Sequence, residues 1–363
     1  MRVLQVIDCF ERSGGAQQFF RDLISEMNRE GVDVEVLSII PPQNGNGEFV
    51  DRATQQGIPV HILTDRSIYD VRNVFAMHHF LHEHVYDIIH VHLFPALYFC
   101  ALAKPKGVKL LYTEHSTDNR RRHSLLFRRI DAWIYRHYER VVCISAKTRE
   151  SLHGKVSKRI PTIDIANGID LAKFREAMPF PINRELGIPD GAKFIAMCAR
   201  FQDGKDYMTL LKSVKYLPDN YHVLCIGDGP LREECETFCQ VHNLLGQVHF
   251  LGLRADVANL FQASDVVVLS TSHEGFSIVM LEAMACGKPF VASAVPGIED
   301  LVKDYAVLFP FGDEIALADC IKKLLSDSGY YNTIASKSIQ FSSRYDIKHT
   351  ARHYIEVYKE CLK

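Results

Sequence analysis

The chain has 363 residues, 47% of them hydrophobic, and a formal net charge of −2. This length favours two domains over one, and the nearly neutral charge argues against a general nucleic-acid binder. None of the ten cysteines forms a C-x-x-C pair, so we expect reduced core thiols rather than disulfides or a zinc site. The chain starts on a strand-like run without a signal peptide, and its longest helix-like apolar run, residues 94–103, is too short to span a bilayer. We therefore expect a cytoplasmic protein, peripheral at most on the inner face of the cell membrane.

The first half of the chain begins with a predicted β–α–β unit. Residues 2–7 and 32–40 are predicted strands, and a helix runs between them up to residue 28. In the first loop, Gly14 and Gly15 allow the backbone to approach a phosphate or a sugar closely. A tight strand-to-helix turn explains the two glycines equally well. The G-x-G-x-x-G dinucleotide fingerprint is not present, because no third glycine follows.

Further strands are predicted at residues 60–63, 88–92 and 108–113, with a helix over 71–84. His90 and His92 bracket one strand residue, and without a third ligand we expect buried packing histidines rather than a metal site. His115 follows the strand over 108–113. It therefore lies at a carboxyl end, where open α/β sheets bind ligands. Taken alone, a histidine in this position is more often structural.

The segment between Asn119 and Arg140 carries seven arginines and two acidic residues, together with the only tryptophan of the chain. An apolar stripe at helical spacing runs through it, and a basic amphipathic helix can dock on an anionic membrane surface. The other interpretation is that the stripe faces the domain core and the arginines are solvated. A strand at 141–145 and the start of a helix follow.

The second half starts after a linker at residues 179–181. A strand over 194–198 is followed by Arg200 and Lys205 on either side of a glycine-containing loop, and this pair can clamp a diphosphate. The alternative is that both side chains are cations exposed to solvent without a ligand. Residues 227–230, Gly-Asp-Gly-Pro, imitate the start of a dinucleotide site. However, Arg232 stands where the third glycine would be, so we interpret them as a turn near a nucleotide base.

Residues 265–294 form the most informative stretch, a predicted strand, loop, helix and second strand. Glu274 lies in the loop and Glu282 follows eight residues later, roughly two turns along the helix. Between them, Gly275, Phe276 and Ser277 present backbone N–H groups at a helix N-terminus, which is an anion site. A ligand with hydroxyls at both ends and negative charge in the middle fits, as a nucleotide sugar has. For an isolated pair of glutamates, the simpler alternative is that Glu274 is an ordinary loop acid and Glu282 an ordinary acid on a helix surface.

The run E-G-F-x(4)-L-E-A-M-A-x-G-x-P-F, residues 274–290, resembles the signature of the retaining glycosyltransferases of family 4. It departs from the commonest form at Phe290, where valine is usual. Weaker similarity extends over nearly the whole chain. It includes T-x-H at 113–115, N-G-I-D at 167–170 and R-x(4)-K at 200–205. The resemblance implies the GT-B fold, which is two α/β Rossmann-like domains facing each other across a cleft.

The resemblance also implies domains and residue roles. Residues 1–178 would bind the acceptor, residues 182–341 the nucleotide sugar, and a terminal helix over 342–363 would pack back on the first domain. As catalytic residues it implies His115 near the reacting carbon, Glu274 on sugar hydroxyls, and Arg200 and Lys205 on the departing diphosphate. The implied donor-binding residues are Gly14, Gly15, Arg200, Lys205, Gly275, Phe276 and Ser277, together with Glu282 on the ribose.

The implied reaction moves a sugar, with retention, from a nucleoside diphosphate sugar, UDP above all, to a saccharide hydroxyl. Because of the arginine-rich segment between Asn119 and Arg140, we expect the acceptor to be lipid-linked, in cell-surface polysaccharide or glycolipid synthesis. We expect no metal, cofactor or nucleic acid to take part. An NAD-dependent oxidoreductase is the rival from another class, and the failure of both glycine fingerprints counts against it. A non-catalytic nucleotide-sugar-binding subunit is disfavoured because Arg200, Lys205, Glu274 and Glu282 are all intact.

Overall fold

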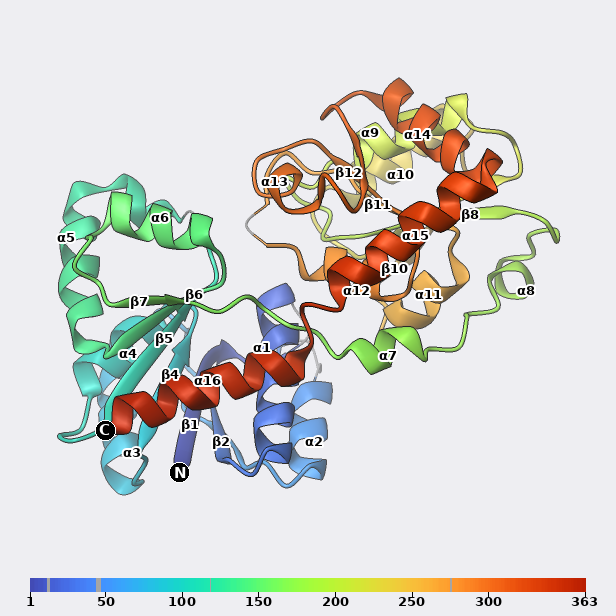
Figure 1. Cartoon of the computed structure of the whole chain (residues 1–363). Helices are drawn as coiled ribbons and strands as arrows, with labels where there is room; N and C mark the ends of the chain where they lie inside the picture. Colours follow the sequence, from blue (N-terminus) through green and yellow to red (C-terminus); the bar gives the residue numbers. More distant parts are fainter. Residues whose placement is uncertain (12–13, 44–46, 118, 275) are drawn as a thin grey trace. The chain divides into compact units, whose positions relative to one another are not determined.

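The computed structural model describes residues 1–11, 14–43, 47–117, 119–274 and 276–363. They form two compact units (Figure 1), of which the first comprises Met1–Gly168 and Ile347–Lys363 and the second Ile169–Asp346. The chain thus leaves the first unit ten residues earlier than the predicted boundary at 178 and returns to it at 347 rather than 342.

The first unit is built on a seven-stranded parallel sheet in the order β3-β2-β1-β4-β5-β6-β7. The predicted strands are confirmed to within about two residues. Their bounds are β1 Arg2–Cys9, β2 Asp33–Ile40, β3 Val60–Ile62, β4 Ile88–His92, β5 Lys109–Glu114, β6 Arg140–Cys143 and β7 Thr162–Asp164. Strand order reverses between β1 and β4, so the loops that follow these two strands diverge there and leave room for a ligand.

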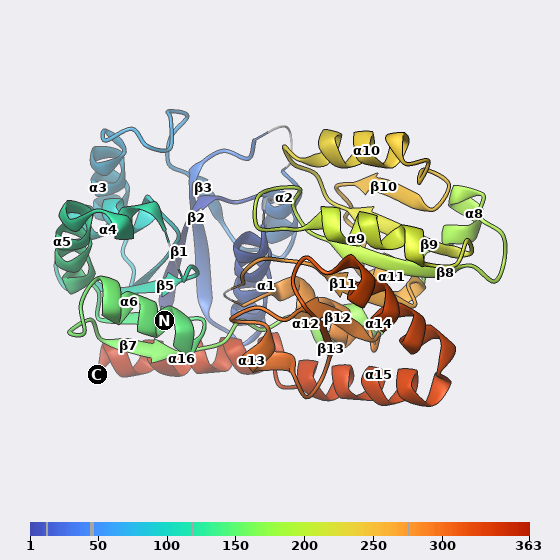
Figure 2. The ribbon, with the colours of Figure 1, turned by 90° about the horizontal axis from the view of Figure 1, so that it is seen from above.

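Helices cover this sheet, and their bounds are α1 Gly15–Arg29, α2 Glu48–Gln55, α3 Asn73–Glu83, α4 Ala96–Ala103, α5 Leu125–Ile134, α6 Ala146–Lys155 and α16 Ile347–Leu362, with short 3-10 turns η1 Arg120–His123 and η2 Tyr135–His137. The terminal helix α16 packs against α1 and buries Tyr354 and Tyr358 completely. In Figure 2 the helices α3, α4 and α5 gather at one side of the unit, and their mutual contacts agree with that view.

The second unit has a six-stranded parallel sheet in the order β10-β9-β8-β11-β12-β13. The strands are β8 Lys193–Cys198, β9 Tyr221–Ile226, β10 Val248–Gly252, β11 Val266–Leu269, β12 Phe290–Ser293 and β13 Val307–Phe309. The helices are α7 Leu171–Arg175, α8 Ile182–Leu186, α9 Tyr207–Ser213, α10 Arg232–Val241, α11 Val257–Ala263, α12 Ile278–Ala285, α13 Glu299–Val302, α14 Glu314–Ser326 and α15 Ser328–Ser342, with the 3-10 turn η3 Val214–Tyr216. Here the order reverses between β8 and β11, the two strands that precede the predicted site loops.

The single terminal helix predicted over 342–363 is wrong at its beginning. Residue 342 ends α15, and α16 starts only at Ile347. Between them the chain makes a turn at Ser343 and Arg344. It then pairs with residue 169, because Ile169 donates its N–H to the Tyr345 carbonyl at 2.9 Å and bridges Asp346. These backbone groups are therefore satisfied by pairing instead of by helix.

Candidate active site

Two loops of the second unit meet at the switch point between β8 and β11. The Gly204 carbonyl accepts hydrogen bonds from Thr271 Oγ1 at 2.7 Å and from the Ser272 N–H at 2.9 Å. Asp206 donates its backbone N–H to the Ser270 carbonyl at 3.0 Å, and Lys205 bridges Thr271 in an antiparallel pair. The loop that carries Lys205 and the loop that carries Glu274 therefore form one backbone-paired platform.

Lys205 and Glu274 form an ion pair between Nζ and Oε1 on this platform, with 21% and 15% of their side chains exposed. The structure thus brings together two of the predicted catalytic side chains, which are 69 residues apart in sequence. Gly204 makes the approach possible. Its φ is +89°, and a Cβ at this position would lie 2.9 Å from His273 Cε1. Any other residue would strain this turn, because residues with a side chain rarely adopt such a positive φ.

Helix α12 begins where the sequence predicts. Ser277 is its N-cap, and the Ser277 hydroxyl accepts from the Met280 N–H at 3.3 Å. Phe276 is buried, with its ring 5.3 Å from the Tyr345 ring, whereas Gly275 lies outside the described residues. The cap leaves the positive end of a helix at the edge of the platform, as an anion site requires.

Glu282 lies on α12 near the end of β8. Besides burial, its negative charge raises the pKa of the Cys198 thiol, which belongs to the last residue of β8. Glu282 is partly exposed, while its helix neighbours Leu281 and Ala283 are completely buried. Arg200, two residues beyond Cys198, is exposed. A carboxylate and a guanidinium thus lie around the end of this strand.

Gly227 and Gly229 have a role that the sequence alone does not reveal. Both have positive φ values, and a Cβ would lie 2.0 Å from the Ala199 carbonyl oxygen and 2.3 Å from that of Phe201, respectively. The glycines therefore let this turn pack directly against the backbone on both sides of Arg200. Their dinucleotide-like spacing is explained by this packing within the protein.

A recess of about 210 Å³ opens beside the same loop, lined by residues 201–208 together with Leu231, Glu234, Cys235, Ser272 and Phe311. Lys205 lines it, while Glu274 and Glu282 do not. Lys205 therefore stands between this recess and the carboxylate of Glu274.

The other predicted site residues belong to the first unit. Gly14 is the N-cap of α1 in extended backbone, with φ −175°, and Gly15 is the first helical residue. His115 directly follows β5, and its Nε2 lies 3.0 Å from Nδ1 of His92. Burial lowers the pKa of His115 to about 4. His90 and His92 are completely buried and hydrogen-bonded, which confirms the prediction of packing histidines.

Sequence reasoning missed Asp8 at the carboxyl end of β1. Burial raises the pKa of this carboxyl group to about 6, opposed by a hydrogen bond from the Cys9 N–H at 2.7 Å. A perturbed carboxylate at the switch point of a sheet is typical of functional sites. The signal available in the sequence was an acid that ends an apolar strand.

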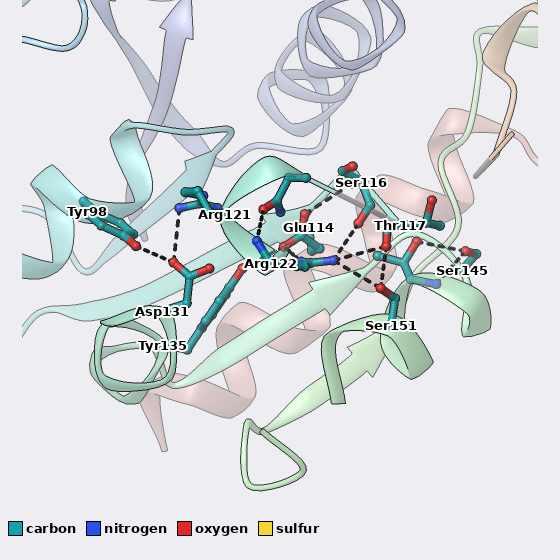
Figure 3. A network of polar contacts seen from close by, with 12 residues as sticks. Tyr98, Glu114, Ser116, Thr117, Arg121, Arg122, Asp131, Tyr135, Ser145 and Ser151 are labelled. Carbon is teal, nitrogen blue, oxygen red and sulfur yellow. Dashed lines mark hydrogen bonds and ion pairs between the residues drawn. The ribbon is translucent and has the colours of Figure 1, made fainter. Parts of the chain in front are cut away.

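Figure 3 shows that two arginines of the predicted basic helix, Arg121 and Arg122, form ion pairs inside the first unit. Arg122 is 1% exposed and pairs through Nη2 with Oε2 of Glu114, which also accepts from Tyr135 Oη at 2.6 Å. Arg121 Nη1 lies 3.3 Å from Asp131 Oδ1, which also accepts from Tyr98 Oη. Both interpretations of this segment, membrane docking and solvated arginines, are therefore wrong for these two residues, because each compensates a buried carboxylate.

The apolar stripe of the same region is divided between core and surface. Ile134 and Tyr138 are buried, whereas Leu126 is 65% and Trp133 49% exposed. Leu125, Leu126, Arg129 and Trp133 fall within an arc of about 100° on α5. One face of α5 therefore presents large apolar side chains next to a cation.

Comparison with known proteins identifies the family. A family model described as Glycosyltransferase Family 4 matches residues 13–173, and one described as Glycosyl transferases group 1 matches residues 180–341. The chain belongs to the family 4 glycosyltransferases. It has the GT-B fold, and neither an oxidoreductase nor a binding subunit is favoured.

Individual relatives agree. The lipopolysaccharide core biosynthesis glycosyltransferase LpsD of Rhizobium meliloti is 26% identical over 358 residues, 96% of each chain. An Escherichia coli UDP-Gal:alpha-D-GlcNAc-diphosphoundecaprenol alpha-1,3-galactosyltransferase is 27% identical over 253 residues, 65% of each chain. The crystal structure of Anabaena Alr3699/HepE in complex with UDP and glucose superposes with a TM-score of 0.85 over 99% of each chain, at 23% identity.

Within the described residues, no helix is long and apolar enough to cross a membrane. The described part of the chain also contains no group of three or more His, Cys, Asp or Glu residues that could hold a metal ion. The ten cysteines are all free.

Proposed function

We propose that this glycosyltransferase moves a sugar from a UDP-sugar to a hydroxyl of a lipid-linked saccharide, with retention of configuration and without a metal ion. The observation that carries the proposal is the paired platform, which holds Lys205 and Glu274 together beside the N-terminus of α12. The name of the E. coli relative supports a UDP-sugar donor and a diphospholipid-linked acceptor, and the HepE complex supports UDP.

The second unit would hold the donor. Arg200 and Lys205 neutralise the diphosphate, and the backbone of Gly275, Phe276 and Ser277 adds donors at the start of α12. Glu274 accepts hydrogen bonds from sugar hydroxyls, and Glu282 from the ribose. Because Lys205 pairs with Glu274, the same ammonium can contact a phosphate oxygen and orient the carboxylate toward the sugar.

The first unit would hold the acceptor, with Gly14 and Gly15 contacting the donor and His115 the transferred sugar. In the proposed front-face step, the bond from the anomeric carbon to the diphosphate breaks while a bond to the acceptor oxygen forms on the same face. The departing diphosphate takes the acceptor proton. Arg200 and Lys205 stabilise the charge that grows on it.

Titration calorimetry of the wild-type protein with UDP, ADP and GDP, followed by UDP-sugars, tests the donor. UDP should bind most tightly, and binding should survive EDTA. NMR of the product should show the anomeric configuration of the donor. An inverted product, or loss of activity in EDTA that Mg²⁺ restores, would contradict the mechanism.

We further propose that α5 docks the first unit on an anionic membrane, at the cytoplasmic face where a lipid-linked acceptor would lie. Leu125, Leu126 and Trp133 are exposed on one arc together with Arg129, although Arg121 and Arg122 are not available. The adjoining helices α4 and α3 also expose large apolar side chains, Leu102 and Phe75. Exposed apolar area beside cations is the composition of an interfacial helix.

Liposome co-sedimentation tests this docking. Anionic vesicles should recruit the protein at low salt and neutral vesicles should not, since each arginine contributes about 1 kcal/mol near such a surface. Arg129→Glu and Trp133→Ser should each weaken recruitment. Lys212→Glu, an equal charge change at an exposed position of α9 in the second unit, should not. Equal recruitment to both vesicle types would refute docking and leave the transferase assignment intact.

A further inference from the structure

A buried chain of polar side chains runs through the first unit from His115 to the terminal helix. His92 on β4 links His115 to Gln5 on β1, and Gln5 contacts Tyr358 on α16. Gln5, His92 and Tyr358 have no exposed surface. Figure 1 shows α16 crossing this unit in front of the sheet. The buried polar side chains therefore connect the carboxyl end of β5, at Glu114, with a helix that begins only at Ile347.

The amide of Gln5 sets the direction of these hydrogen bonds. Its Nε2 lies 2.9 Å from Tyr358 Oη and 3.4 Å from the sulfur of Met27, so both amide hydrogens point at acceptors. Tyr358 Oη also lies 2.6 Å from Nδ1 of His90 and 3.8 Å from the Met27 sulfur, so its own hydrogen has an acceptor other than Gln5. The Gln5 Oε1 therefore faces His92 Nε2, at 3.1 Å. An amide oxygen only accepts, so His92 carries its proton on Nε2.

The tautomer of His92 then determines that of His115. A neutral imidazole protonated on Nε2 has a lone pair on Nδ1, and His92 Nδ1 lies 3.0 Å from His115 Nε2. His115 must donate there, which leaves its Nδ1 without a hydrogen. Among the described residues this covered Nδ1 has no hydrogen-bond partner. A buried polar atom without a partner is exceptional and points to a ligand or water.

The three histidine rings are uncharged near neutral pH, so each ring carries only one N–H proton. Burial lowers the pKa of His90 to about 3 and of His115 to about 4, and that of His92 well below its usual range. The Phe19 and Phe20 rings of α1 also pack against His115 and His92, and these rings cannot exchange protons.

We propose that Gln5 and His92 are positioning residues that lock His115 as the Nε2–H tautomer, so that its Nδ1 accepts a hydrogen bond from a substrate hydroxyl. This rests on the proposed function, in which His115 contacts the sugar. An Nδ1 lone pair attracts a hydroxyl donor and repels a phosphate or carboxylate oxygen. His115 is then an acceptor that selects for hydroxyl groups and does not act as an acid toward the leaving group.

Nitrogen-15 NMR of ring-labelled histidine in the whole protein tests the inference, with the His115 signals assigned by their loss in His115→Asn. Wild type should show the neutral Nε2–H tautomer of His115 from pH 5.5 to 8, and saturating UDP-sugar or acceptor should perturb Nδ1. An Nδ1–H tautomer, a charged ring at neutral pH, or no response to either substrate would overturn the proposal. The NMR results do not depend on turnover. Failure of this inference can therefore be distinguished from failure of the proposed transfer reaction.

Variants of His92 separate positioning from mere folding. His92→Leu removes the acceptor, and His92→Asn restores one near the position of Nδ1. We expect His92→Leu to give mixed His115 tautomers and to lower kcat about three- to tenfold, the effect of one neutral hydrogen bond, with UDP affinity unchanged. His92→Asn should recover most of the Nε2–H tautomer of His115 and most of kcat. His249→Leu is the matched control, since it breaks the His222–His249 contact at 3.1 Å in the second unit and should leave the His115 signals unchanged. Equal kcat and tautomer content in His92→Leu and wild type would refute the role of His92.

Discussion

Removing the Arg122 guanidinium should destabilise the first unit by several kilocalories per mole. Arg122 is 1% and Glu114 3% exposed, so Arg122→Met leaves a carboxylate charge in the interior without its cation. Breaking a buried pair in this way costs about 3–5 kcal/mol. Glu114 keeps two donors, Tyr135 Oη at 2.6 Å and the Ser116 N–H at 3.2 Å. The expected loss is therefore at the lower end, about 3 kcal/mol.

The assay is urea denaturation followed by tryptophan fluorescence. Trp133 is the only tryptophan and lies on α5, so its emission reports on unfolding of the first unit separately from the second. Arg129→Met is the matched control, because it removes the same charge from an exposed position of the next helix in the chain, α5. It should change the free energy of unfolding by no more than about 0.5 kcal/mol.

The double variant Arg122→Met/Glu114→Gln provides the decisive comparison. It removes the stranded charge but keeps an oxygen that accepts from Tyr135, so it should be more stable than Arg122→Met alone. If Arg122→Met behaves like Arg129→Met, or if the double variant loses the sum of the two single losses, the pair is not the interaction that we describe.

Three further predictions concern charge at the site. Arg200→Ala and Lys205→Ala should each weaken UDP binding by roughly 1.5–3 kcal/mol, the value of a charge-assisted hydrogen bond; unchanged calorimetric affinity would remove these residues from the diphosphate site. Glu282→Gln should weaken binding of both UDP and UDP-sugar. Glu274→Gln should lower turnover and leave UDP binding equal or tighter, because Lys205 is released from its partner. Equal weakening of UDP binding by the two variants would refute the division of roles. Asp8 has a pKa of about 6 in the folded chain against 3.8 ordinarily, so the folded chain loses stability as pH rises through this range. Asp8→Asn should therefore raise the free energy of unfolding by up to about 3 kcal/mol at pH 8 and have little effect below pH 4. A gain in stability that is independent of pH would contradict this.

The sequence alone was sufficient for the strands and for the family. Parallel strands buried on both faces read as continuous apolar runs rich in β-branched residues, and β11 is such a run. The signature over 274–290 also located the loop and the helix start correctly, because Ser277 is an N-cap that acts within its own turn. Local signals of this kind depend on neighbours in sequence and need no tertiary partner.

Helix ends and charge partners depended on the tertiary structure. The break between α15 and α16 arises because residues 345 and 346 pair with Ile169, which is far away in sequence. Nothing in the spacing of arginines distinguishes Arg122 from Arg129. Only the fold places a buried Glu114 beside the first and leaves the second exposed.

The candidate site shows the same division. The sequence supplied Lys205, Glu274 and His115 as residue types in suitable loops, and the switch point of the second sheet brought the loops of Lys205 and Glu274 together. The ion pair of Lys205 with Glu274 and the tautomer of His115 follow from contacts between strands and helices distant in sequence. The protonation state of a buried group is set by what surrounds it, and a linear sequence does not contain that environment.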